Sequence, residues 1–156
     1  TTRMSSGMPD LTGLSISDVA TATNITLAAD TISVINYTGA AAATCTLPAA
    51  TAGTIVVYCQ SKDTTGGTAT LVFDAAGSDV WATGSVIESR ASSEVTFDTS
   101  AASETKLTFT PANAATNLLT TGGQIAFICY EDATWHIATK LAAETTQVTG
   151  AFVFAA

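Results

Sequence analysis

One stretch of this chain, residues 44–61, shows a strand that ends, turns and starts again. Its sequence is TCTLPAATAGTIVVYCQS. Cys45 and Leu47 alternate with threonines, and Pro48 cannot donate a ladder hydrogen bond. Gly53 then precedes a new apolar run over residues 55–59. This order of strand, turn and strand is typical of a β-sheet, and it is the strongest constraint on the fold.

Similar segments and turns recur along the whole chain. Strands are expected at residues 24–27, 31–37, 43–47, 54–61, 68–73, 80–87, 94–98, 106–110, 124–130, 134–140 and 147–154. Their spacing of roughly ten residues indicates an all-β fold, a β-sandwich or barrel, rather than alternating strands and helices. Residues 54–60 and 125–130 are apolar on both faces, so we expect these two strands at the centre of the core.

Turn residues predict two hairpins and one helical turn. The sequence Asp-Thr-Thr-Gly-Gly at residues 63–67 would join the strands around residues 55 and 71. Glu-Asp-Ala at residues 131–133 would join the strands around residues 127 and 137. Pro111 could open a single helical turn with Thr110 as its cap.

The first 20 residues differ from the rest. They contain glycines and a proline among small polar residues, without a sustained period of 2 or 3.6. We therefore expect an extended N-terminal arm over residues 1–20 and a single β domain over residues 21–156. Ordering a backbone costs about 1–2 kcal/mol per residue, and residues 1–16 have few apolar groups to offset this cost. They are expected to be mobile in the isolated protein.

The composition excludes several classes of partner. The net charge is −8 with only five Lys and Arg, so no basic stripe is present for direct nucleic-acid binding. The sequence contains no run of 18 apolar residues, so it predicts no membrane span. Charged residues make up 12%, about half the usual share, while Thr and Ala are abundant. Such a small, uncharged surface suits packing against neighbouring proteins.

The cysteines suggest no metal site. Cys45, Cys59 and Cys129 are odd in number and lack CxxC spacing, which argues against a zinc knuckle or a disulfide framework. We expect them to be buried free thiols. Cys59 and Cys129 occupy matching places in two similar runs, so a bridge between them stays an alternative. The acidic turns lack the spacing of a calcium loop, and we expect no metal and no cofactor.

Little in the sequence indicates catalysis. His136 is the only histidine, and its parity is opposite to that of Trp135, so it is expected to face outward. No GxSxG motif presents a nucleophile. A glycosidase pair of carboxylates stays open, but it would need open aromatic subsites, and the chain has two Trp and three Tyr. We expect a protein that is not an enzyme.

Three segments taken together resemble a class of phage proteins. They are residues 46–53 (TLPAATAG) followed by a strand, residues 67–73 (GTATLVF) leading into AGSD at 76–79, and residues 123–127 (GQIAF) ending in TWHI at 134–137. This pattern of turns and small residues over residues 31–140 resembles β-modules of tailed-bacteriophage virion proteins. Such modules occur in head decoration (cement) proteins and in tail or head fibres. The resemblance implies a structural role and carries over no catalytic residues.

The resemblance leads to an expected function. We expect a capsid decoration protein that clusters as a trimer on the outer capsid surface of the virion and braces the major capsid protein. The arm residues expected to bind the capsid are Arg3, Met4, Met8, Leu11, Leu14 and Ile16. On docking, their side chains would fill gaps between capsid subunits while the main chain extends a neighbouring sheet edge. The strand-like C-terminus should bury Phe152 and Phe154 within the domain or against a sister subunit, and we expect both at a subunit interface.

The alternative is a tail-fibre or head-fibre module that binds host surface glycans. Sugars stack on exposed aromatic faces. An accessible Trp81 or Trp135 would therefore favour glycan binding, whereas buried aromatic residues would favour the decoration protein.

Overall fold

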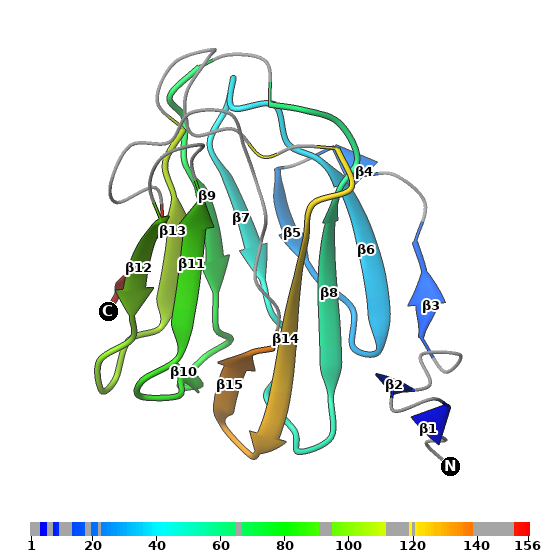
Figure 1. Ribbon diagram of the computed structural model, residues 1–156, viewed down its shortest axis with the longest axis vertical. Helices are drawn as coiled ribbons and strands as arrows, with labels where there is room; N and C mark the ends of the chain where they lie inside the picture. Colours follow the sequence, from blue (N-terminus) through cyan, green and yellow to red (C-terminus); the bar gives the residue numbers. More distant parts are fainter. Residues whose placement is uncertain are drawn as a thin grey trace.

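The computed structural model describes residues 4–5, 8–9, 14–17, 20–21, 23–64, 67–90, 95–111, 119, 121–138 and 152–156. These residues form sixteen β-strands and no helix, which confirms the all-β prediction. Two large sheets face one another as a sandwich, and two separate strand pairs accompany them (Figure 1).

The larger sheet has seven strands. In spatial order they are β10 (Val80–Trp81), β15 (Thr134–Ile137), β14 (Gln124–Glu131), β8 (Ile55–Gln60), β6 (Thr31–Asn36) and β3 (Ser15–Ile16), with β4 (Ala20–Thr21) also paired to β6. The second sheet has five strands. They are β16 (Phe152–Ala155), β13 (Lys106–Phe109), β9 (Leu71–Asp74), β7 (Ala43–Thr46) and β5 (Asn24–Thr26). The separate pairs are β1 (Met4–Ser5) with β2 (Met8–Pro9), and β11 (Val86–Arg90) with β12 (Val95–Thr99).

From β3 to β9 the chain passes back and forth between the two sheets. β3, β4, β6 and β8 lie in the seven-stranded sheet, while β5, β7 and β9 lie in the five-stranded sheet. Every pairing among these strands is parallel. Parallel neighbours need a long crossover, and here each crossover contributes a strand to the opposite sheet. This half of the protein is therefore a flattened coil, which we call the coil stack.

The later strands close one end of the coil stack. β14 pairs antiparallel with β8, with Ile125 opposite Tyr58, and β13 pairs antiparallel with β9, with Leu107 opposite Phe73. β8 and β9 are the last strands of the coil, so both sheets change from parallel to antiparallel at the same end. At the other end, no further strand among the described residues pairs with β3 or β5.

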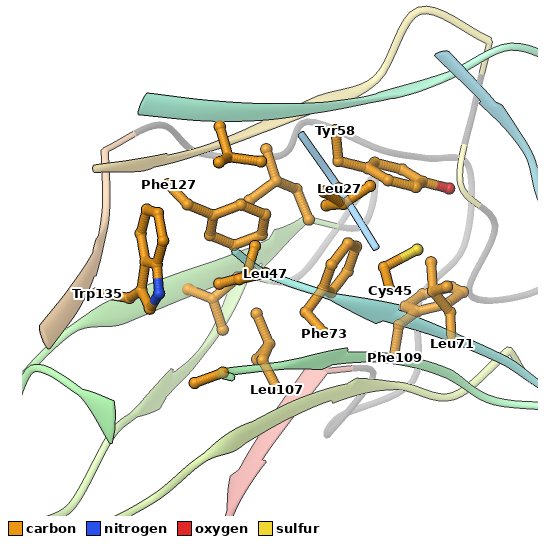
Figure 2. Packing of buried hydrophobic residues seen from close by; sticks show 14 of the residues in the cluster. Leu27, Cys45, Leu47, Tyr58, Leu71, Phe73, Leu107, Phe109, Phe127 and Trp135 are labelled. Atoms are coloured by element: carbon orange, nitrogen blue, oxygen red, sulfur yellow. The ribbon is translucent and has the colours of Figure 1, made fainter. Parts of the chain in front are cut away.

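The core lies between the two sheets. Phe73 of β9 packs edge-on against Tyr58 of β8, with ring centroids 5.1 Å apart, and lies 5.3 Å from the ring of Phe127 in β14 (Figure 2). All three side chains are fully buried. Such aromatic pairs contribute about 0.5–1.5 kcal/mol beyond their burial. The two sheets are thus joined by interlocking rings.

The prediction that two strands contribute to the centre of the core is confirmed for one face. β8 and β14 are neighbours within the seven-stranded sheet, and Val56, Tyr58 and Phe127 face the core with 0% exposure. The expectation that both faces are covered is wrong for β14. On its opposite face Ile128 is half-buried and Tyr130 is 67% exposed.

The hairpin predicted at residues 63–67 is wrong, because β8 and β9 lie in different sheets. Instead, the segment that enters β9 packs on the loop after β6. Ala69 N donates to Gly39 O at 3.2 Å, and a Cβ on Gly67 would lie 2.1 Å from the same oxygen. The turn residues correctly predicted that the chain changes direction. Because the segment before β9 packs on the loop after β6, however, β9 joins the opposite sheet.

The strand predicted at residues 80–87 divides into β10 and β11. A turn separates them, with Ser85 N bonded to Ala82 O at 2.9 Å and Gly84 at a φ of 84°. The hairpin predicted at residues 131–133 is confirmed, because β14 and β15 pair antiparallel around it. The helical turn predicted after Pro111 lies outside the described residues, as do residues 139–140 and 147–151 of two predicted strands.

Candidate functional site

Part of the predicted arm is an edge strand of the seven-stranded sheet. Ser15 N donates to Asp30 O at 3.1 Å, and Ser17 N donates to Ile32 O at 3.0 Å. These bonds form a parallel ladder between β3 and β6. The expectation of a wholly mobile segment over residues 1–16 is therefore wrong for residues 15–16.

Serine and threonine hydroxyls strengthen this attachment. Ser17 Oγ accepts a hydrogen bond from Val34 N at 3.0 Å, and Ser15 Oγ lies 2.8 Å from Thr31 Oγ1. These side-chain bonds add to the main-chain ladder, and each contributes about 0.5–1.5 kcal/mol. They explain why a segment with few apolar side chains is ordered here.

The structure distributes the other arm residues as follows. Leu14 is half-buried beside β3, and the side chain of Ile16 is 72% exposed. Met4 and Met8 belong to the β1–β2 pair, which joins neither large sheet. Arg3 and Leu11 lie outside the described residues. The structure thus places one large apolar side chain of the arm, that of Ile16, in solvent.

A hollow of about 250 Å³ opens between the two sheets at the end of the coil stack formed by β3, β4 and β5. We call it the end hollow. Its lining contains no charged side chain and consists of Ser17, Ala20, Ile25, Thr26, Leu27, Ala28, Thr31, Ser33 and Ile35. Leu27 and Ile35 also belong to the hydrophobic core, so the hollow reaches the core itself. Sequence patterns did not predict this feature, because it depends on which strands end up at the edges.

A second hollow, of about 390 Å³, lies at the opposite edge of the seven-stranded sheet, beside β10 and β15. We call it the β15 hollow. It is lined by Val80, Trp81, Ala82, Thr83, Ala102, Ser103, Glu131, Thr134 and His136. Next to it, the ring of Tyr130 is 67% exposed and packs against the His136 ring at 4.8 Å.

The prediction that His136 faces outward is confirmed for the direction of its side chain, but the side chain is not fully exposed. Trp135 is fully buried in the core, and His136 lies on the other face of β15. His136 is nevertheless half-buried, because Tyr130 packs against it. Its Nε2 atom is buried and has no hydrogen-bond partner among the described residues.

Both tryptophans are inaccessible from the surface. Trp81 is 1% exposed and Trp135 is 0% exposed. The Trp81 ring lies 5.5 Å from the Phe127 ring and 5.8 Å from the Phe154 ring. Neither indole face is open for stacking against a sugar.

The C-terminal strand β16 is part of the domain's own core. Phe152 is 3% exposed and packs 5.0 Å from the Phe109 ring, and Phe154 is 5% exposed. Between them, Val153 points outward with 45% exposure. The expected burial of the two phenylalanines is met within the domain, so it lends no support to their predicted place at a subunit interface.

The three cysteines are free thiols; Cys45 and Cys129 are buried as predicted, whereas Cys59 is only half-buried. In the β8–β14 register Cys59 lies opposite Gln124, whereas Cys129 N bonds to Thr54 O at 3.0 Å. The two cysteines are thus five ladder positions apart, about 17 Å, whereas a disulfide needs Cα atoms within about 7 Å. The alternative of a Cys59–Cys129 bridge is wrong, because antiparallel pairing places the matching positions at opposite ends. Burial raises the pKa of the Cys45 thiol to about 12.

A buried polar network that sequence patterns did not reveal joins the sheets near the loop after β8. Gln60 is 0% exposed; its Nε2 donates to Tyr37 O at 2.7 Å, and its Oε1 accepts from the Tyr58 hydroxyl. The Tyr37 hydroxyl donates to Ala69 O. Burial raises the pKa of both tyrosines. Every group of this network that we name has a partner, so the network is structural.

Charged groups are sparse and mostly tie loops together. The Asp63 carboxylate accepts bonds from Thr121 N at 2.7 Å and from its hydroxyl at 2.8 Å, and these bonds lower the pKa of Asp63. Over the part of the chain that the structure describes, no three His, Cys, Asp or Glu side chains gather as metal ligands. In that same part, no helix has the length and hydrophobicity to cross a membrane.

Comparisons of this chain with protein-family models, with curated proteins and with solved structures found no match. The candidate sites are therefore the anchored arm, the end hollow and the β15 hollow, each defined by its geometry.

Proposed function

We propose that this protein is a capsid decoration protein that binds the outer surface of a phage head and stabilises the shell. The observation that carries the proposal is the attachment of the arm. Residues 15–17 are held along β6 by main-chain and hydroxyl hydrogen bonds, while Ile16 projects into solvent. A rigid sandwich thus presents an apolar side chain on an anchored edge strand, at the root of a longer N-terminal segment.

The burial of the aromatic residues supports the same function. Trp81 and Trp135 are both within the core, as expected for a decoration protein rather than a glycan-binding fibre. The charged fraction of 12% also fits a surface that packs against neighbouring subunits. In this proposal the arm residues contact the major capsid protein, and several copies cluster on the shell.

The test is cosedimentation of the full chain with heads and, separately, with tails of the phage that carries it. We expect the chain to cosediment with heads in a fixed ratio to the major capsid protein, and to increase the temperature at which the heads open. Ile16→Asp should weaken attachment about tenfold, since it places a charge on the exposed apolar contact. Val86→Asp is the matched control, because Val86 is also an exposed apolar strand residue, at 47%, but lies far from the arm in sequence. Cosedimentation with tails alone would contradict the proposal.

One observation favours the alternative function, a glycan-binding fibre module. The exposed ring of Tyr130 lies beside the β15 hollow, which contains the polar side chains of Glu131, Thr134 and His136. An exposed aromatic ring next to polar groups is an arrangement on which a sugar can stack and form hydrogen bonds. If this is the function, Tyr130→Ala should abolish binding to host-cell polysaccharide, and Val86→Ala should leave it intact.

A further inference from the structure

The open end of the coil stack exposes main-chain groups that are suited to pairing with another strand. Thr44 N bonds to Thr23 O, and Leu27 N bonds to Thr46 O, so the odd-numbered residues of β5 face β7. Strand alternation therefore directs the N–H and C=O groups of Asn24 and Thr26 away from β7. We call this outward side of β5 the end edge.

Two other strand edges of the sandwich, those of β16 and β10, are protected, in contrast to the end edge. At β16, the N–H of Phe154 is bonded to Asp98 Oδ2 at 2.6 Å. At β10, the N–H of Trp81 is bonded to Glu104 O at 2.9 Å. Proteins commonly block edge strands with charged groups, prolines or covering loops. Among the described residues, β5 has none of these features, and its side chains are Asn24, Ile25 and Thr26.

The end hollow beside this edge indicates what kind of strand would fit. Its lining has no charged side chain, and Ile25 packs against the core at its rim. A charged partner would lose hydration there without gaining an opposite charge. The occupant should therefore be an extended, uncharged segment with small or flexible apolar side chains.

One segment of the N-terminal arm, between Arg3 and Asp10, has that chemistry. Residues 4–9 read MSSGMP and contain no charge. The β1–β2 pair, formed by residues 4–5 and 8–9, joins neither large sheet, and an isolated two-stranded pair is only marginally stable in water. Residues 1–13 can span about 43–47 Å when extended, more than twice the length of an ordinary strand.

The arm of a second copy is better placed than the chain's own arm. The chain's own arm enters the domain along β6, where β3 already occupies the edge of the seven-stranded sheet. Figure 1 shows β1 and β2 beyond β3, apart from β5. The arm of another copy is not constrained in this way, and exchange of arms is a common basis of homo-oligomers.

We propose that the end edge of one copy accepts the N-terminal arm of a second copy as an added strand, with an apolar side chain of the arm seated in the end hollow. The main chain of the arm would extend the five-stranded sheet. The contact concerns the isolated chain and does not rest on the capsid function. If this contact between two copies does not form, the chain could still attach to heads. If the chain does not attach to heads, this contact could still form.

The first experiment measures self-association of the full chain by sedimentation velocity over a series of concentrations. We expect association that increases with concentration. Thr26→Pro removes the outward N–H of β5 and should reduce the association constant about tenfold, the effect of losing one to two main-chain hydrogen bonds. Thr26→Val keeps the N–H and should reduce the association constant much less than Thr26→Pro does. A full chain that stays monomeric, or a folded Thr26→Pro variant that associates normally, would overturn the proposal.

A second experiment identifies the occupant even where Thr26→Pro fails to fold. Full chains carrying Ser5→Cys are mixed with full chains carrying Asn24→Cys, and the mixture is oxidised mildly. We expect a cross-linked heterodimer in the mixture and much less cross-linking in either chain alone. Cross-linking of Asn24→Cys chains with one another would show edge-to-edge pairing instead and would overturn the assignment of the arm. No cross-link in the mixture would overturn it as well.

Discussion

The carboxylate of Asp98 accepts a hydrogen bond from the main-chain N–H of Phe154, with 2.6 Å between Oδ2 and N. This bond ties the β11–β12 pair to the C-terminal strand, although the two belong to different sheets. It also satisfies a donor that would otherwise be free to pair with another chain.

Replacing this carboxylate should weaken the fold. Asp98→Ala leaves the N–H of Phe154 without a partner and should lower the free energy of unfolding by about 1–3 kcal/mol in urea denaturation. Asp98→Asn keeps an oxygen acceptor and should lose less. Equal stability of the wild type and Asp98→Ala would show that the bond contributes nothing.

The two C-terminal phenylalanines should be among the most sensitive positions. Phe152→Ala and Phe154→Ala each remove a ring that is buried among other rings, so each should lower the free energy of unfolding by about 3–5 kcal/mol. Val153→Ala, on the exposed face of the same strand, should change it by roughly 0.5 kcal/mol or less. Similar losses at all three positions would mean that strand pairing rather than core packing is measured.

Stability should decrease at alkaline pH. Burial raises the pKa of the Cys45 thiol to about 12, so the folded protein keeps a proton that the unfolded chain releases above roughly pH 8.5. Because the unfolded state then binds fewer protons, the free energy of unfolding falls as the pH rises from about 8.5 toward 12. The raised pKa values of Tyr37 and Tyr58 act in the same direction above about pH 10. In Cys45→Ala, urea denaturation should show a shallower decrease between about pH 8.5 and pH 10, and an unchanged slope would assign the effect to other groups.

Two glycines with positive φ should differ sharply in their tolerance of alanine. Gly67 has a φ of 101° and its added Cβ would lie 2.1 Å from Gly39 O, whereas Gly53 has a φ of 92° and open space around it. Gly53→Ala should lose about 1–2 kcal/mol of stability from backbone strain alone. Gly67→Ala should lose roughly 1–3 kcal/mol more because the two loops must separate. Thermal melting of both variants provides the comparison.

Shortening the arm should reveal where the domain begins. Deleting residues 1–13 should leave the melting temperature unchanged at concentrations where the chain is monomeric, because the β3 ladder remains. Deleting residues 1–17 removes the bonds from Ser15 and Ser17 to β6 and should lower stability by about 1–3 kcal/mol. Equal melting temperatures for the two truncations would indicate that β3 is bound only weakly.

The sequence by itself determined where most strands lie and which faces they bury. Alternation within residues 31–36 and 124–131, and breaks at Pro48 and Gly53, depend on interactions between near neighbours, which a local pattern records. The burial of Phe152 and Phe154 was predicted for the same reason. Function was predicted from a resemblance over residues 31–140, whereas the arm and the C-terminal strand were singled out by composition and strand pattern.

Only the tertiary structure decided which sheet each strand joins. The turn at residues 63–67 predicted a hairpin, yet β8 and β9 lie in opposite sheets because the loop packs against Gly39. A turn sequence sets a change of chain direction, whereas the pairing partner depends on contacts between residues that are distant in the sequence. The end hollow, the exposed Tyr130 and the edge strand formed by residues 15–16 arise from that same long-range arrangement, so no local pattern could have predicted them.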